Sequence, residues 1–167
     1  MRTDILDLHK FYESPLGARA RAAIEARLVE KWGEATGLRV AGFGHAAPYL
    51  AAFARAERTL ALAPDAQGAM RWPVEGRNLA CLVGETTWPL PDSSIDRLLI
   101  VHGLEEASDP RALMREAWRV LAPTGRIIVV AAHRRGLWSM ADTTPFAAGR
   151  PWLKRQLLRL MQEAMLK

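Results

Sequence analysis

Residues 89–132 read PLPDSSIDRLLIVHGLEEASDPRALMREAWRVLAPTGRIIVVAA, and this stretch decides the fold. The segments 97–102 and 126–132 are apolar almost throughout and lack the alternation of a half-exposed strand, so they indicate strands buried on both faces. Between them, Asp109 and Pro110 are typical of a helix start, an N-cap side chain followed by proline. A strand, a helix and a second strand in this order predict two parallel strands joined by a crossover helix.

The rest of the chain continues this alternation of strands and helices. Ser14 and Pro15 predict another helix start, and this helix is expected to end near Gly33 or Gly37. The remaining strands are expected at 38–41, 59–63 and 78–83, and the remaining helices at 48–56 and 154–166. Five short strands among helices predict an α/β fold, with a Rossmann-like, doubly wound and mostly parallel sheet.

Such sheets bind ligands beyond the carboxyl ends of their strands, where the strand order reverses. The loops expected to share this crevice follow Ala41, Ala63, Val83 and His102. The first of these loops, residues 42–47, reads GFGHAA. We expect Gly42 to permit the tight turn and Gly44 to let a ligand approach the backbone.

The same loop fits the nicotinamide fingerprint G-x-G-x-x-A. That fingerprint expects an acidic residue at the end of the second strand, where it binds a ribose hydroxyl. Here the strand ends in Ala63, and the nearest acid is Asp65. A nicotinamide-dependent oxidoreductase is therefore an alternative that rests on this loop alone.

The second half of the chain favours another family. Residues 89–105 hold a leucine-proline pair, an aspartate-serine turn, a hydrophobe-aspartate pair and a strand that ends at a histidine. Residues 119–126 add arginine-hydrophobe-leucine and a proline-glycine turn into the last strand. In order, spacing and residue type this run resembles the class I S-adenosylmethionine-dependent methyltransferases of the methyltransferase type 11-like group. The resemblance covers residues 38–135 and implies the strand order 3-2-1-4-5.

The resemblance implies S-adenosylmethionine as cofactor and methyl transfer to a small-molecule or protein acceptor. It places the methionine and ribose against the glycine loop, and the adenine near Glu85, helped by Thr86 and Trp88. The cofactor-binding residues that it implies are Gly42, Phe43, Gly44, His45, Ala63, Pro64, Glu85, Thr86 and His102. Among these, His45 is a candidate for the cofactor carboxylate and His102 is a candidate general base.

Carboxylates that are usual in this family are absent or displaced. Val40 stands where an acid precedes the first loop glycine, and Ala63 replaces the acid of the second strand. The acid after the third strand aligns with Gly84, so Glu85 is shifted by one position. Each charged hydrogen bond of this kind contributes about 1.5–3 kcal/mol. A catalytically degenerate, methyltransferase-like binding or regulatory subunit is therefore the second alternative.

The end of the chain also departs from the family. The family fold adds a helix and an antiparallel hairpin after the fifth strand, whereas residues 154–167 suffice for the helix alone. We therefore expect the C-terminal hairpin to be missing and the edge of the fifth strand to be exposed, which invites pairing with another chain. A protein partner or a homodimer is expected to cover this edge.

Several further side chains carry predictions. Tyr12 either folds over the crevice as part of a lid or packs the first helix. Asp96 stands at a strand start and is expected to be structural. Trp118 is expected in the core, on the inner side of its helix with Leu113, Ala117 and Leu121. Residues 133–138 follow the fifth strand and are the candidate contact for an anionic substrate.

The 167 residues suit one domain. We divide it into an N-terminal helical lid or cap (1–37), a cofactor-binding core (38–135) and a C-terminal loop and helix (136–167). The excess of positive charge behind the net +5 gathers in residues 126–167, without the dense, aromatic-interleaved patch of a nucleic-acid site. No apolar run reaches the length of a membrane span. The single cysteine, Cys81, allows no disulfide framework or cysteine-based metal site, so we expect a cytoplasmic protein.

Overall fold

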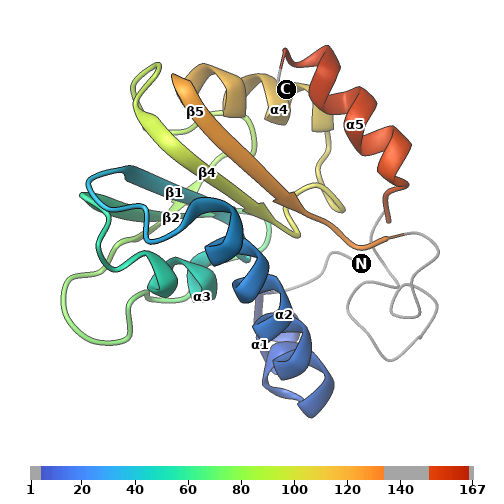
Figure 1. Ribbon diagram of the computed structural model, residues 1–167. Coiled ribbons are helices and arrows are strands. Elements are labelled where there is room, and N and C mark those ends of the chain that lie inside the picture. Colours follow the sequence, from blue (N-terminus) through green and yellow to red (C-terminus); the bar gives the residue numbers. More distant parts are fainter. Residues whose placement is uncertain (1–4, 134–150, 166–167) are drawn as a thin grey trace.

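The computed structural model describes residues 5–133 and 151–165 (Figure 1). Within these residues five strands form one sheet in the order β3-β2-β1-β4-β5, and every neighbouring pair is parallel. The strands are β1 (Arg39–Gly44), β2 (Arg58–Pro64), β3 (Ala80–Val83), β4 (Ile95–Val101) and β5 (Leu121–Val130). The predicted α/β fold and strand order are confirmed.

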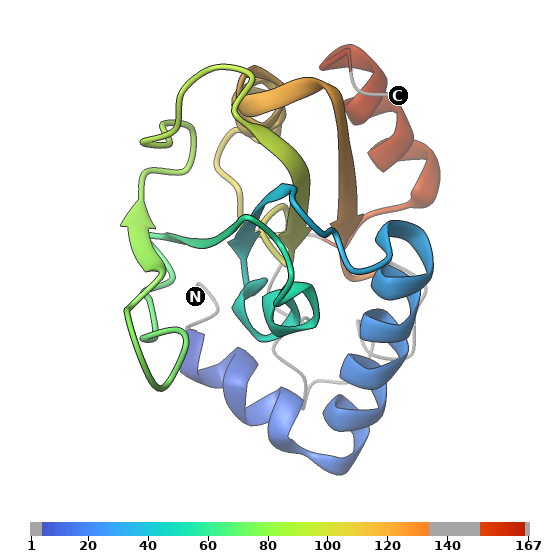
Figure 2. The ribbon, with the colours of Figure 1, turned by 60° about the vertical axis from the view of Figure 1, so that its left-hand side comes forward.

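Helices cover both faces of the sheet, as Figures 1 and 2 show. The helices are α1 (Ile5–Glu13), α2 (Pro15–Trp32), α3 (Ala47–Leu50), α4 (Pro110–Val120) and α5 (Lys154–Glu163). Side chains of α2 and α3 share one apolar core with the sheet, and side chains of α4 and α5 share the other. Helix α1 packs against α2 near the carboxyl ends of the central strands.

The inner strand β4 explains why the sheet needs two covering layers. Leu98 and Ile100 belong to the core on the α4 side, whereas Leu99 and Val101 belong to the core on the α2 side. All four side chains are fully buried. Burial of each such side chain contributes about 1.5–3 kcal/mol, so neither face can be left open to water without a large loss of stability.

Two predicted helix starts are confirmed by their hydrogen bonds. The Ser14 hydroxyl accepts the Gly17 N–H, and Pro15 is the first residue of α2. The Asp109 carboxylate accepts the N–H groups of Arg111 and Ala112. These caps satisfy backbone donors that a helix start otherwise leaves without partners.

Some sequence-based expectations were wrong in detail. The helix predicted at 48–56 is the short α3 followed by a 3-10 turn at Ala51–Phe53, and Ala46 provides no side-chain cap.

Trp118 was expected in the core but is 46% exposed. Met114 and Val120 complete the inner face of α4 instead, and Leu121 begins β5. Neighbouring residues point about 100° apart on a helix, so burial of Ala117 turns Trp118 outward.

The edge of β5 is open in the described part of the chain. In residues 5–133 and 151–165, β5 pairs with β4 and with no other strand. Its residues 127–130 are only partly buried, although each of them is apolar. No helix in these two ranges is both long and apolar enough to cross a membrane.

Candidate functional site

Four strand ends meet at one crevice, as the sequence predicted. A small cavity there is lined by Phe43 of β1, Pro64 of β2, Glu85 after β3 and Gly103 after β4, together with Ala66, Gln67, Glu106 and Ala107. This is the reversal point of the strand order, because β1 lies between β2 and β4. The cavity measures about 20 Å³. Room for one water takes ~10–15 Å³, so in this conformation it holds little more than that.

The glycine turn is packed against β4. Gly44 has φ +77°, and a Cβ on it would lie 2.4 Å from the carbonyl oxygen of Val101. The N–H of His45 donates to the same oxygen at 2.7 Å. Gly42, which was expected to make the tight turn, is not in the left-handed region; a Cβ on it would meet Ala46 at 2.6 Å. The turn therefore depends on Gly44, while Gly42 permits close packing of α3.

Tyr12 of α1 is buried against His45 and His102, beside the strand ends. Its ring stacks on the His45 ring, with centroids 5.1 Å apart and planes 12° apart. Its hydroxyl lies 2.6 Å from Nε2 of His102. Gln67 also contacts both segments: its side-chain amide donates to the His102 backbone carbonyl, and its backbone carbonyl accepts the N–H of Ile5. The predicted packing of the first helix is confirmed, because Tyr12 forms a buried cluster with Leu8 of α1 and Ala20 of α2. The lid function stays a prediction.

Burial controls the charge states in this crevice. Desolvation raises the pKa of the Tyr12 phenol, and the neighbouring Tyr49 and Glu105 add to the rise. Desolvation, aided by the nearby His102, lowers the pKa of His45 to about 3. Both groups are therefore neutral around pH 7, so the crevice presents two uncharged rings to each other.

The remaining predicted cofactor residues lie around the same crevice. Ala63 and Pro64 are buried at the end of β2, whereas Thr86 is exposed. Glu85 lines the cavity, but its carboxylate accepts hydrogen bonds from the Ser108 hydroxyl and the Asp109 N–H. Trp88 is buried in the core against Phe43, with ring centroids 4.9 Å apart. Glu85 thus holds the start of α4 in this conformation.

Two crevice residues were not identified as functional candidates from the sequence. Glu105 lies 2.7 Å from Nδ1 of His102, and its carboxylate also accepts the N–H of Ala132. Gln67 is buried over the cavity. Glu105 follows the strand-end histidine by three residues, a spacing that allows the contact. Gln67 lies in a loop whose course no sequence pattern indicated.

Other predicted residues lie away from this crevice. Asp96 accepts the backbone N–H and the side chain of Arg39, with contacts of 2.9–3.2 Å that join β4 to β1. Its predicted structural role is confirmed. Residues 134–138 of the candidate substrate-contact loop 133–138 lie outside the described residues. His133 forms an isolated parallel β-bridge with Trp152.

Buried polar atoms show what the crevice can bind. Within the described residues, both ring nitrogens of His45, Oε1 of Gln67 and Oε2 of Glu105 are buried without a hydrogen-bond partner. Such groups normally find a partner, so these atoms fit a polar ligand better than an apolar core. The cavity of about 20 Å³ is too small for an adenosyl group in this conformation. The residues that line this cavity have to move before a ligand of that size can enter.

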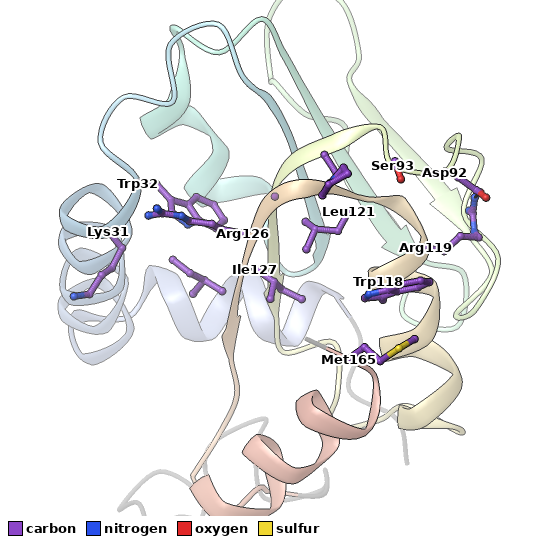
Figure 3. A pocket seen from close by; sticks show the side chains of 14 residues that line it. Lys31, Trp32, Asp92, Ser93, Trp118, Arg119, Leu121, Arg126, Ile127 and Met165 are labelled. Atoms are coloured by element: carbon purple, nitrogen blue, oxygen red, sulfur yellow. Dashed lines mark hydrogen bonds and ion pairs between the residues drawn. The ribbon is translucent and has the colours of Figure 1, made fainter. Parts of the chain in front are cut away.

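A second concavity runs along the open edge of β5 (Figure 3). It measures about 870 Å³ and lies on both sides of the strand. Trp32 of α2 lines it on one side, and Trp118 of α4 and Met165 line it on the other. This groove is separate from the crevice at the strand ends, since the two share no lining residue.

The parallel sheet, its strand order and the crevice beside the glycine turn define a Rossmann-like fold of the class I methyltransferase type. Residues 39–129 match the family described as Methyltransferase domain, which is more than half of the chain. The chain therefore belongs to the class I S-adenosylmethionine-dependent methyltransferase family. This confirms the resemblance noted in the sequence.

Solved structures agree with this fold. An S-adenosylmethionine-dependent methyltransferase from Aquifex aeolicus is 19% identical, with a TM-score of 0.62 over 84% of this chain and 78% of that one. A second such enzyme, from Archaeoglobus fulgidus, is 16% identical, with a TM-score of 0.65 over 95% and 72%. A Haloferax volcanii methyltransferase complex with the Trm112 activator matches at 16% identity, TM-score 0.58, over 88% and 74%. Comparison with curated proteins gave no match.

Proposed function

We propose that this chain transfers a methyl group from S-adenosylmethionine to a small-molecule or protein acceptor. The observation that carries the proposal is the contact between the glycine turn and the end of β4, where His45 N–H donates to Val101 at 2.7 Å. This contact lies within the segment that matches the methyltransferase family. The bound cofactor would supply a methyl group already activated by its sulfonium charge, so the protein mainly has to align the acceptor.

The chain offers two groups of contacts for the cofactor. Backbone groups of the turn 42–45 and of Gly103 would face its methionine part. Pro64, Gln67 and Glu85 line the side where its adenosine would lie. Because Ala63 provides no carboxylate, the Gln67 amide is the buried polar group left to bind the ribose. A neutral amide binds a hydroxyl less strongly than a carboxylate does, so a modest affinity is expected.

Isothermal titration with S-adenosylmethionine and with S-adenosylhomocysteine tests this proposal. We expect binding, and we expect Gln67→Ala to weaken it about tenfold through loss of one buried hydrogen bond. Gln162→Ala, at an exposed position of α5, is the matched control. No heat and no thermal shift at millimolar cofactor would contradict the proposal. A fluorescence titration with reduced nicotinamide cofactors tests the oxidoreductase alternative.

The second candidate function is a degenerate, non-catalytic subunit that binds another protein. Two observations favour it: the crevice is closed to about 20 Å³, and the groove along β5 measures about 870 Å³. A strand added at this edge would place alternate side chains toward Trp32 and toward Trp118. The Haloferax volcanii relative is a methyltransferase in complex with an activator protein. A stable complex or homodimer in size-exclusion chromatography, without cofactor binding, would support this candidate.

A further inference from the structure

Three buried side chains form a continuous chain of hydrogen bonds in the crevice. The Tyr12 hydroxyl lies 2.6 Å from Nε2 of His102, and Nδ1 of His102 lies 2.7 Å from Oε1 of Glu105. The same carboxylate oxygen accepts the N–H of Ala132 at 2.7 Å. Each of the three side chains is less than 10% exposed. The imidazole ring is therefore held in one orientation from both of its nitrogens.

The direction of these hydrogen bonds follows from the donors available. An ionised carboxylate only accepts, so Nδ1 of His102 carries the proton that faces Glu105. The other nitrogen, Nε2, then carries a lone pair, and the Tyr12 hydroxyl donates to it. His102 thus presents a basic nitrogen to a phenol, while Glu105 fixes the tautomer. This is the arrangement that a general base needs toward an acidic hydroxyl.

The phenol in this position belongs to the N-terminal helix α1. Tyr12 lies on α1, outside the family-matched segment 39–129, and Ser14 alone separates α1 from α2. The Tyr12 hydroxyl occupies the hydrogen-bonding position at Nε2 of His102, so a ligand can reach this nitrogen only when the Tyr12 side chain leaves. A ligand that takes the place of the Tyr12 side chain would contact Nε2 of His102 and the face of the His45 ring.

We propose that His102 is the general base for an acceptor that bears a phenolic hydroxyl, and that Glu105 is its positioning residue. The inference rests on the proposed methyl transfer. The acceptor oxygen would form its bond to the methyl carbon as the carbon–sulfur bond breaks. The bonding pair stays on sulfur and cancels the sulfonium charge, and the hydroxyl proton moves to Nε2 of His102.

The surroundings favour an aromatic acceptor and leave His102 as the base. The stacked Tyr12 and His45 rings mark a slot for a planar ring, with an uncharged imidazole as its wall. His45 does not compete for the proton, because burial keeps its pKa at about 3. Within residues 5–133 and 151–165, the titratable groups that face His102 include Tyr12 from α1, His45 from the turn after β1, and Glu105 from its own loop.

The experiment deletes the Tyr12 side chain and adds a free phenol of the same shape as a methyl acceptor. In Tyr12→Ala, p-cresol has the shape of the deleted side chain, so the variant with S-adenosylmethionine should convert it to 4-methylanisole. The matched amine probe, 4-methylbenzylamine, should react at least tenfold more slowly. Wild-type protein assayed with both probes provides the same comparison if Tyr12→Ala does not fold.

Two substitutions then separate the roles. His102→Asn, chosen because Asn tolerates the positive φ of this position, should lower p-cresol methylation about 100-fold. The affinity of the same variant for S-adenosylhomocysteine separates loss of the base from loss of cofactor binding. Glu105→Gln should lower kcat more than it changes KM, because a neutral amide fixes the orientation of the imidazole less firmly than a carboxylate does. The exposed pair His9 and Glu13 provides the controls His9→Asn and Glu13→Gln, which should change neither.

The outcomes distinguish this inference from the function on which it rests. If S-adenosylhomocysteine does not bind in calorimetry, the methyl-transfer proposal and this inference both fall. If it binds but the amine is methylated in preference to p-cresol, the base role of His102 is refuted and the proposed function stands. A His102→Asn variant that methylates p-cresol at the wild-type rate refutes it as well.

Discussion

At the level of single residues, the buried imidazole of His45 links the crevice to the pH dependence of stability. Burial lowers its pKa to about 3 from the ordinary 6.5. Between these values the unfolded chain binds a proton that the native state does not, so stability falls as the pH drops through this window. The slope is at most about 1.4 kcal/mol per pH unit.

We therefore expect wild-type protein to lose about 1–2 kcal/mol between pH 6.5 and pH 5 from this residue alone. His45→Phe, which keeps a ring against Tyr12, should remove most of that loss. Urea denaturation at a series of pH values measures it, with Gln162→Ala at an exposed position of α5 as control. Equal pH dependence in wild type and His45→Phe would show that His45 is protonated when folded.

Asp96 should also lose its contribution to stability as the pH falls, but the cause is favourable hydrogen bonds to its charged form and not desolvation. The Arg39 guanidinium and backbone N–H hold the pKa of this carboxyl below its ordinary value, against a smaller effect of desolvation. A lowered pKa adds stability above the unfolded value near 4, and this stability is lost as the pH falls through the folded value. Asp96→Asn should cost about 1–2 kcal/mol at pH 7 and much less near pH 3, in urea denaturation at both pH values. Asp65→Asn, at an exposed position, should cost little at either pH.

Some of these residue roles were available from the sequence, and others were not. The position of Asp96 at a strand start predicted its structural role, because the pattern around it fixed the strand. Trp118 was placed wrongly, since a helical pattern with apolar residues at 117 and 118 does not say which one faces inward. Glu105 and Gln67 gain their meaning from contacts with His102 that only the folded chain creates.

At the level of elements, the turn from β1 into α3 depends on Gly44. A Cβ there would lie 2.4 Å from a backbone oxygen of β4, in addition to the strain of φ +77°. Gly37 has a similar φ of +70° but open space around it. Substitution of Gly37 therefore measures the cost of the positive φ without the cost of a steric clash. We expect Gly44→Ala to cost about 2–4 kcal/mol and Gly37→Ala about 1 kcal/mol in chemical denaturation. Equal costs would mean that β4 moves aside without penalty.

Helix α1 is the element whose position should respond to ligand. It closes the crevice through Tyr12, and Ile5 N–H donates to Gln67. Binding of S-adenosylhomocysteine should displace these contacts and raise amide hydrogen exchange across Ile5–Glu13 severalfold, while α4 stays unchanged. Slower exchange in α1 would instead show that the helix closes over the ligand with Tyr12 still inside.

Element types were easier to predict than their limits. The apolar runs at 97–102 and 126–132 are strands because both of their faces meet helices. The helix expected at 48–56 is shorter because Ala46 gives it no side-chain cap and the 3-10 turn follows at once. Caps and turns of this kind involve one or two hydrogen bonds, which an apolar pattern does not reveal.

For the whole molecule, the sheet order followed from the resemblance, but the closure of the crevice did not. The loops after the strands meet where the alternation of helices and strands predicted. Whether α1 leaves that meeting place open depends on Tyr12, which sits 90 residues from its partner His102 in the sequence. A contact across such a separation is set by the packing of α1 and α2, so no local pattern contains it.

The open edge of β5 makes a prediction for the molecule in solution. Its backbone has no strand partner within the described residues, and the groove beside it exposes Trp118 and Met165. If a second copy covers this edge, unfolding releases two chains, and stability rises with concentration. A free partner concentration of about 100 times Kd adds about 2.7 kcal/mol, which corresponds to several degrees in Tm.

Calorimetric scans over a hundredfold range of protein concentration measure this shift. Trp118→Lys, at the groove, should abolish it, whereas Val74→Lys, on an exposed loop, should not. A Tm that does not depend on concentration would leave a different protein as the occupant of this edge.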